Sequence, residues 1–222
     1  MRTTLKALVV GGISFSLASP VLAHPRIDLH LDAIISASGT PQSEPIITFE
    51  NFTNGTSGVM ATISGMQGAE FLNALAFNFG GTGTPSFNHI SGPMATVSFD
   101  TNDVTLGPVG QGGSGFDVLF DFPNSNGPGD PRFTGADLSS VWTITGAGVD
   151  ENDFNVTNAS GLFAMAHIGS IGANGQASAF VGAQGDFVAP IPEAEVYAMM
   201  LAGLGLLGFV MSRRRRSVVP AI

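Results

Sequence analysis

The sequence predicts an all-β protein: an antiparallel β-sandwich, with a jelly roll as one arrangement, between a signal peptide and a single C-terminal transmembrane helix. Charged residues make up only 11 % of the 222 residues, whereas glycine occurs 30 times and proline 13 times. This balance is typical of extracellular β domains. Short runs of alternating hydrophobic and polar residues, separated by turn-forming stretches, fill residues 46–187.

The N-terminus has the three parts of a secretory signal peptide. Arg2 and Lys6 precede twelve small or apolar residues, and a break at Ser19-Pro20 leads to the small residues of "VLA". This order predicts a signal peptide at residues 1–23, with cleavage between Ala23 and His24. Residues 24–45 are then expected to form a strand, in "IDLHLDAII", and a loop.

The run "FDVLFDF" (116–122) illustrates the predicted strands of the sandwich at residues 46–187. Phe116, Val118, Phe120 and Phe122 would share one face, and the two aspartates the other. A helical turn is expected at Asp150–Phe154, where Asp150 can cap free N–H groups. Further strand candidates are "IITFENF" (46–52), "VMATIS" (59–64), "ALAFNF" (74–79), "ATVSF" (95–99), "DVTL" (103–106), "VWTIT" (141–145), "GLFAMAHI" (161–168) and "ASAFV" (177–181).

The C-terminus reads as a membrane anchor. Sixteen uncharged residues, 196–211, would form a helix of roughly 24 Å, slightly short of the ~30 Å hydrocarbon core. Four arginines follow, and such clusters stay on the cytoplasmic side. We therefore expect a linker at 188–195, a transmembrane helix at 196–212, a basic cytoplasmic tail at 213–222, and the body outside the cytoplasm. A buried core helix is the alternative.

The segment "PIPEAEVYAMMLAGLGLLGFVMSRRRR" (190–216) resembles the PEP-CTERM sorting signal of Gram-negative bacteria. Pro192 and Glu193 match the first two motif positions, and Ala194 stands where the family usually has proline. A glycine-containing helix and the cluster Arg213, Arg214, Arg215 and Arg216 follow in the same order. The resemblance implies processing by an exosortase and delivery to the cell surface or the exopolysaccharide matrix. It covers 27 residues and assigns no family to the body.

Charge and composition exclude several classes of function. The body from His24 to Ala189 has fifteen acidic residues against Arg26 and Arg132, which leaves thirteen uncompensated negative charges. Nucleic acid is therefore not expected as a partner. The chain has no cysteine, so disulfides, thiolate metal sites and cysteine nucleophiles are excluded. No G-x-S-x-G motif is present either, and the chain is not expected to be an enzyme.

The loop "DFPNSNGPGD" (121–130) is the main candidate for metal binding. Oxygens from Asp121, Asn124, Asn126 and Asp130 suit calcium, which takes six to eight oxygen ligands. The spacing is not that of an EF-hand, and such residues also form ordinary turns. The stretch "DEND" (150–153) has the same two interpretations. No other cofactor is expected.

These features predict an exported cell-surface or matrix protein with a non-catalytic structural or interaction role. Its expected partners are the Sec translocation machinery, signal peptidase, an exosortase-type enzyme, the membrane and exopolysaccharide. One alternative is a polysaccharide-binding module, assisted by calcium, for which Trp142 would have to be exposed to stack on sugars. A secreted β-sandwich enzyme is a further alternative, which requires two acids, or an acid and a histidine, to converge.

Overall fold

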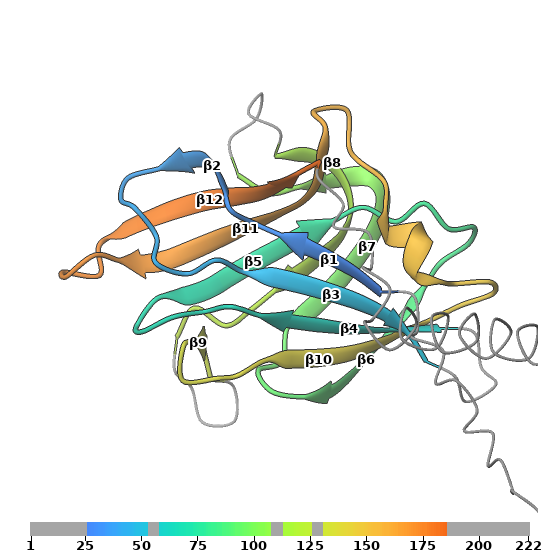
Figure 1. Cartoon of the computed structure of the whole chain (residues 1–222), viewed down its shortest axis with the longest axis horizontal. Coiled ribbons are helices and arrows are strands. Elements are labelled where there is room, and N and C mark those ends of the chain that lie inside the picture. Colours follow the sequence, from blue (N-terminus) through green and yellow to red (C-terminus); the bar gives the residue numbers. More distant parts are fainter. Residues whose placement is uncertain (1–25, 53–57, 108–112, 126–130, 186–222) are drawn as a thin grey trace, which may run out of the picture.

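The computed structural model describes residues 26–52, 58–107, 113–125 and 131–185. These residues form twelve strands and one 3₁₀ helix, and they contain no α-helix (Figure 1). Every strand pair is antiparallel. The all-β, antiparallel prediction is confirmed, whereas the signal peptide (1–23), the linker (188–195), the transmembrane helix (196–212) and the tail (213–222) lie outside the described residues.

Two sheets make up the structure. The smaller has the order β1-β3-β4-β10-β6: β1 is Arg26–His30, β3 Ile46–Asn51, β4 Gly58–Ser64, β10 Ser140–Thr145 and β6 Ser86–Ser91. The larger has the order β2-β12-β11-β5-β8-β7: β2 is Ala33–Ala37, β12 Ala177–Gln184, β11 Leu162–Ile171, β5 Phe71–Phe77, β8 Ser114–Asp121 and β7 Thr96–Thr105. The short β9, Phe133–Thr134, pairs with β5.

Aromatic side chains fill the space between the two sheets. Phe49 of the smaller sheet stacks on Phe154 at 4.0 Å, and both contact Phe77 of the larger sheet, at 5.4 and 5.9 Å. Further along, Phe120 of the larger sheet meets Trp142 of the smaller at 4.8 Å, edge to face. All five rings are 3 % exposed or less. With no cysteine to cross-link the fold, burial of this core provides much of its stability.

The N-terminal segment forms two strands rather than one, and each joins a different sheet. β1 pairs with β3 at the edge of the smaller sheet, and β2 pairs with β12 at the edge of the larger. Leu31, between them, is fully buried, and its N–H donates to the carbonyl of Pro45. The chain passes between the sheets at this point, so the segment before Ile46 is part of the sandwich.

The strand at "FDVLFDF" differs from the predicted alternation at its start. Val118, Phe120 and Phe122 enter the core between the sheets, but Phe116 belongs to a second hydrophobic cluster. Gly115 has φ 78°, and the pairing of β7 with β8 shifts between Phe99 and Val104. This irregularity turns the start of β8, so strict period-two geometry does not extend to Phe116.

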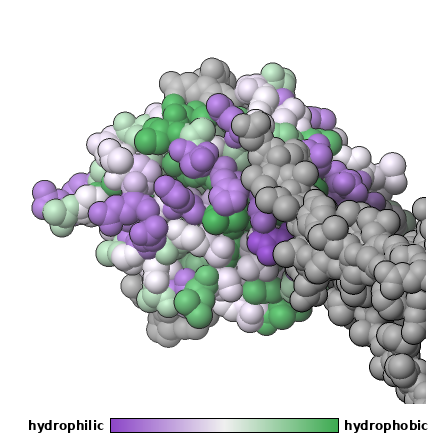
Figure 2. Space-filling view, viewed as in Figure 1, coloured by the Kyte–Doolittle hydropathy of each residue, from purple (hydrophilic) through white to green (hydrophobic). Residues whose placement is uncertain are grey.

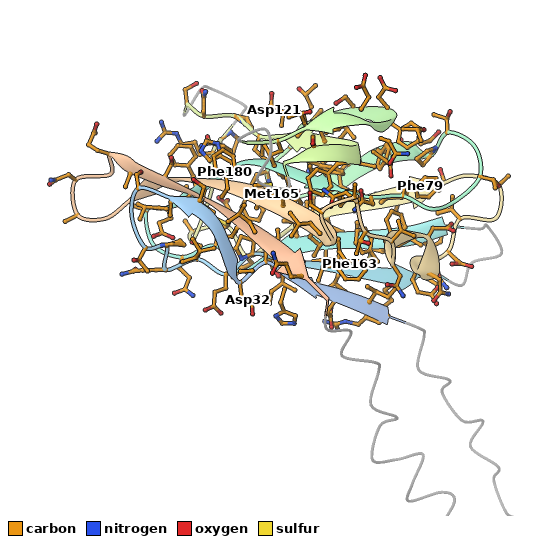
Figure 3. All side chains as sticks on the ribbon, turned by 90° about the horizontal axis from the view of Figure 1, so that it is seen from above. Asp32, Phe79, Asp121, Phe163, Met165 and Phe180 are labelled. Atoms are coloured by element: carbon orange, nitrogen blue, oxygen red, sulfur yellow. The ribbon has the colours of Figure 1, made fainter. Side chains whose placement is uncertain are left out.

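The second cluster lies on the face of the larger sheet that points away from the smaller one. Met165 and Ala76 alternate with residues of the inter-sheet core, so they point to the opposite face. The chain leaving β7 covers them: a Cβ placed on Gly107 would lie 2.8 Å from Phe180 and 3.2 Å from Met165. Figure 3 shows Phe180 and Met165 beside each other. We call this group the outer cluster: Ala74, Ala76, Val104, Leu106, Phe116, Leu162 and Met165.

Candidate functional site

The predicted sorting signal follows directly on the end of the described fold. The described chain starts at β1 and ends just after β12, and these two ends lie on the same side of the sandwich (Figure 3). The cleavage site at Ala23 and His24, the motif Pro192, Glu193 and Ala194, and the cluster Arg213–Arg216 lie outside the described residues. Among the residues that are described, no helix has the length and apolar character needed to cross a membrane.

The predicted calcium loop is described only in part. Asp121 is the last residue of β8 and is exposed, and the backbone carbonyl of Asn124 accepts a 2.7 Å hydrogen bond from Nε of Arg132. The guanidinium of Arg132 also lies 4.2 Å from the centre of the Phe71 ring. An arginine thus provides the positive charge next to this carbonyl. Asn126 and Asp130 lie outside the described residues, and calcium binding stays a prediction.

The stretch "DEND" forms the expected helical turn. Its 3₁₀ helix η1 spans Glu151–Phe154, and the carboxylates of Asp150 and Asp153 form a capping box around its first turn. Glu151 is buried and accepts a hydrogen bond from the side chain of Asn51, whose amide oxygen in turn accepts the N–H of Glu151. Glu151 thus fastens the turn to Asn51 of β3, which positions Phe154 in the core.

Two more buried carboxylates each hold backbone from distant parts of the chain. Glu70, 5 % exposed, accepts the N–H groups of Gln42 and Ser43 at 2.8–3.1 Å. Asp117, 5 % exposed, accepts the N–H of Phe79 at 2.8 Å and that of Asn102 at 2.6 Å. Each carboxylate therefore accepts hydrogen bonds from the backbone N–H groups of two other residues, which is typical of a carboxylate with a structural role. Sequence reasoning did not find these contacts.

The strand register places His167 and Asp121 on one face of the larger sheet, which makes them a candidate acid–histidine pair. Both pair with Ala74 of β5, so only one strand lies between them. The His167 ring, however, stacks on Phe180 of β12 at 4.4 Å, on the side away from β8, and its Nδ1 is 3.4 Å from Nδ2 of Asn73. Burial lowers the pKa of His167. The contacts of the His167 ring are therefore packing contacts.

Trp142 offers no stacking platform to a sugar. Its side chain is 3 % exposed, and its Nε1–H donates to Oγ of Ser140. Ser140 in turn donates to the carbonyl of Pro93, so both polar groups are satisfied inside the protein. The feature that would favour a polysaccharide-binding module is not present at this residue. In the described part of the chain, no group of three or more metal-ligating side chains comes together.

Comparison with known proteins identifies the C-terminal segment. Residues 190–216 match the PEP-CTERM protein-sorting motif, which confirms the resemblance at the same boundaries. Neither curated proteins nor solved structures give a match to the chain. The motif indicates an exported protein whose C-terminus is anchored in the membrane before an exosortase-type enzyme processes it. The body preceding it has no family assignment.

Proposed function

We propose that the protein is a non-catalytic component of the cell surface or exopolysaccharide matrix. Signal peptidase removes residues 1–23, and an exosortase-type enzyme cuts within the linker at 188–195. The observation that carries this proposal is the match of residues 190–216 to the sorting motif. The protein is held briefly in the inner membrane with its body outside the cytoplasm, and is then released or attached at the surface.

The physical properties of the tail support this order of events. Sixteen uncharged residues barely span the hydrocarbon core, and the arginines Arg213–Arg216 keep their end in the cytoplasm. This arrangement places Pro192 and Glu193 at the outer interface. Pro190 and Pro192 lack N–H donors and disfavour helix, so we expect an extended linker there. A membrane-embedded processing enzyme requires such an accessible, extended segment.

The geometry of the body supports a passive role. Both described ends lie on one side of the sandwich (Figure 3), so we expect a tether at the C-terminus to direct the opposite side away from the membrane. The carboxylates of Glu70, Asp117 and Glu151 bind main-chain or asparagine groups, and His167 is packed against Phe180. These three buried carboxylates and the half-buried His167 therefore have structural partners, so they are not free to act in a catalytic site.

Substitution of the four arginines tests the role of the sorting signal. In Arg213–Arg216→Ser the helix loses its cytoplasmic stop, so membrane retention and the processed product should both decrease. The control removes residues 217–222 and keeps the arginines; it should be processed like the wild type. Immunoblots of membrane and surface fractions, with and without the host's exosortase, measure both forms. Wild-type processing of the serine variant, or processing without exosortase, would contradict the proposal.

A further inference from the structure

β6 is an edge strand that contains no charged residue and no proline. In the described part of the chain it pairs only with β10, so one side of its backbone has no strand partner. Natural edge strands usually carry charges, proline or bulges that prevent pairing with another chain. The edge strand β1 contains Arg26 and Asp28, and β7 contains Asp100 and Asp103. β6, with the sequence SFNHIS, has no charge and no proline, and in this it resembles β2. Its register against β10 skips Ile90, so a bulge lies near its end.

Exposed hydrophobic side chains surround this edge. Ile90 is 59 % exposed, Met94 58 % and Leu138 91 %. They lie close together because two contacts join their segments. Ser91 at the end of β6 pairs with Val141 of β10, and Ser140 of β10 donates a hydrogen bond to the carbonyl of Pro93, which follows β6. Figure 2 shows hydrophobic residues along the lower edge of the molecule, where β10 and β6 lie in Figure 1. We call β6 with Ile90, Met94 and Leu138 the β6 edge.

Charge also distinguishes the β6 edge from the rest of the surface. Residues 71–99 contain no Asp, Glu, Lys or Arg, and neither do residues 138–149. The body as a whole carries thirteen uncompensated negative charges, so two copies repel each other over most of their surfaces. At the β6 edge this repulsion is weakest. A second copy of the protein, which carries the same negative charge, can therefore approach most easily at this edge.

We propose that two copies of this protein pair through β6, in antiparallel orientation about a two-fold axis. The pairing joins the two smaller sheets into one continuous ten-stranded sheet. Phe87 packs against the core and the His89 ring lies 4.9 Å from Trp142, so both side chains face inward. Because directly opposite residues share a face, the two-fold axis that pairs Phe87 with His89 of the other copy passes through Asn88.

The His89 ring provides a second argument for this register. Its Nε2 is buried and has no hydrogen-bond partner within the described residues. A buried polar nitrogen without a partner destabilises the protein unless a partner is supplied. In this register Phe87 of the other copy lies opposite the ring, and His89 of the other copy is its diagonal neighbour and brings a polar side chain to it. Closure about a two-fold axis also gives a defined dimer rather than an open fibre.

The absence of cysteine makes the proposed register directly testable. Directly opposite residues of antiparallel strands have Cα atoms ~4.5–5.5 Å apart, and disulfides accept Cα separations of ~4.4–6.8 Å. Asn88→Cys in the full chain should therefore form a disulfide-linked dimer when oxidant is added. The matched control is Ile34→Cys on β2, an edge strand that also lacks charge, where the isoleucine is 54 % exposed. It should stay monomeric on the same non-reducing gel.

A second substitution separates specific pairing from collision. Adding Ile90→Lys to Asn88→Cys should reduce the cross-linked dimer at least tenfold, because it places like charges at the interface. Sedimentation velocity should show a dimer for the wild-type chain and for Ile34→Lys, and a monomer for Ile90→Lys. Equal cross-linking at residues 34 and 88, no cross-linking at residue 88, a product of another mass, or a monomeric wild type would each overturn the proposal.

Discussion

Removal of the Asp117 carboxylate should destabilise the sandwich strongly, although the residue lies in a strand whose alternation marks it as solvent-facing. Its two oxygens accept the N–H groups of Phe79 and Asn102, at 2.8 and 2.6 Å. Asn102 has φ 56° and lies in the stretch where β7 departs from regular pairing with β8. Asp117 therefore links Asn102, in the irregular part of β7, to Phe79, which lies just after β5.

The size of the effect follows from the surroundings of the two donors. Hydrogen bonds to charged groups contribute about 1.5–3 kcal/mol, and a buried donor left without a partner costs about 1–3 kcal/mol. Phe79 is buried, so in Asp117→Ala its N–H has no replacement, whereas Asn102 is exposed and its N–H can bind water. We expect Asp117→Ala to lower the free energy of unfolding by about 2–4 kcal/mol. Asp117→Asn, which keeps one acceptor oxygen, should lose about half of that.

Urea unfolding followed by fluorescence of Trp142 measures these changes. Trp142 is the chain's single tryptophan and is 3 % exposed, so its emission reports loss of the core. Asp103→Asn, at an exposed position of β7, is the control and should stay within about 0.5 kcal/mol of the wild type. In domains of this size each kcal/mol lowers the melting temperature by about 2–4 °C. An Asp117→Ala variant as stable as the control would refute the structural role of this carboxylate.

Three further predictions concern a glycine, a histidine and the calcium loop. Both Gly92 and Gly83 have positive φ, but Gly92→Ala should destabilise the protein far more than Gly83→Ala. A Cβ on Gly92 would collide with the carbonyl oxygen of Ser139, whereas one on Gly83 would meet no atom. Equal urea midpoints for the two variants would contradict this contact. Because burial lowers the pKa of His167, the unfolded chain binds the proton more readily, and stability should fall as the pH drops below about 6.5. His167→Phe should flatten melting temperatures between about pH 7 and 5.5, and parallel curves would count against this effect. If the loop at 121–130 binds calcium, melts with calcium and with chelator should differ, and identical melts would remove that site.

The strands of the core were predictable because burial on one face leaves a period-two pattern. The run "VWTIT" forms a strand whose Trp142 and Ile144 share a buried face, and the helical turn at 150–154 has the expected cap. β6 was not predicted: its sequence is largely polar, because an edge strand is only partly buried. The division of "IDLHLDAII" into β1 and β2 was also missed, since both halves alternate alike and the sequence does not encode the change of sheet.

The roles of the buried carboxylates could not be predicted from local patterns. Glu70 binds backbone N–H groups near residue 42, and Asp117 binds that of Phe79, so each contact joins segments that are far apart in the sequence. Asp117 alternates with hydrophobic residues just as a solvent-facing aspartate would. The sorting signal was found from the sequence because its features follow one another along the chain: the Pro-Glu motif, the apolar run and the arginines.

The mass of the intact protein recovered from the surface of its own cells tests the central claim most directly. Removal of the signal peptide and of the sorting signal predicts a chain that starts at His24 and ends before Val196, within the linker. The same protein from cells without exosortase should start at His24 and keep its C-terminus. Surface-released protein that still carries Arg213–Arg216 would contradict the account, and the C-terminal segment would then be an ordinary membrane anchor or part of a folded core.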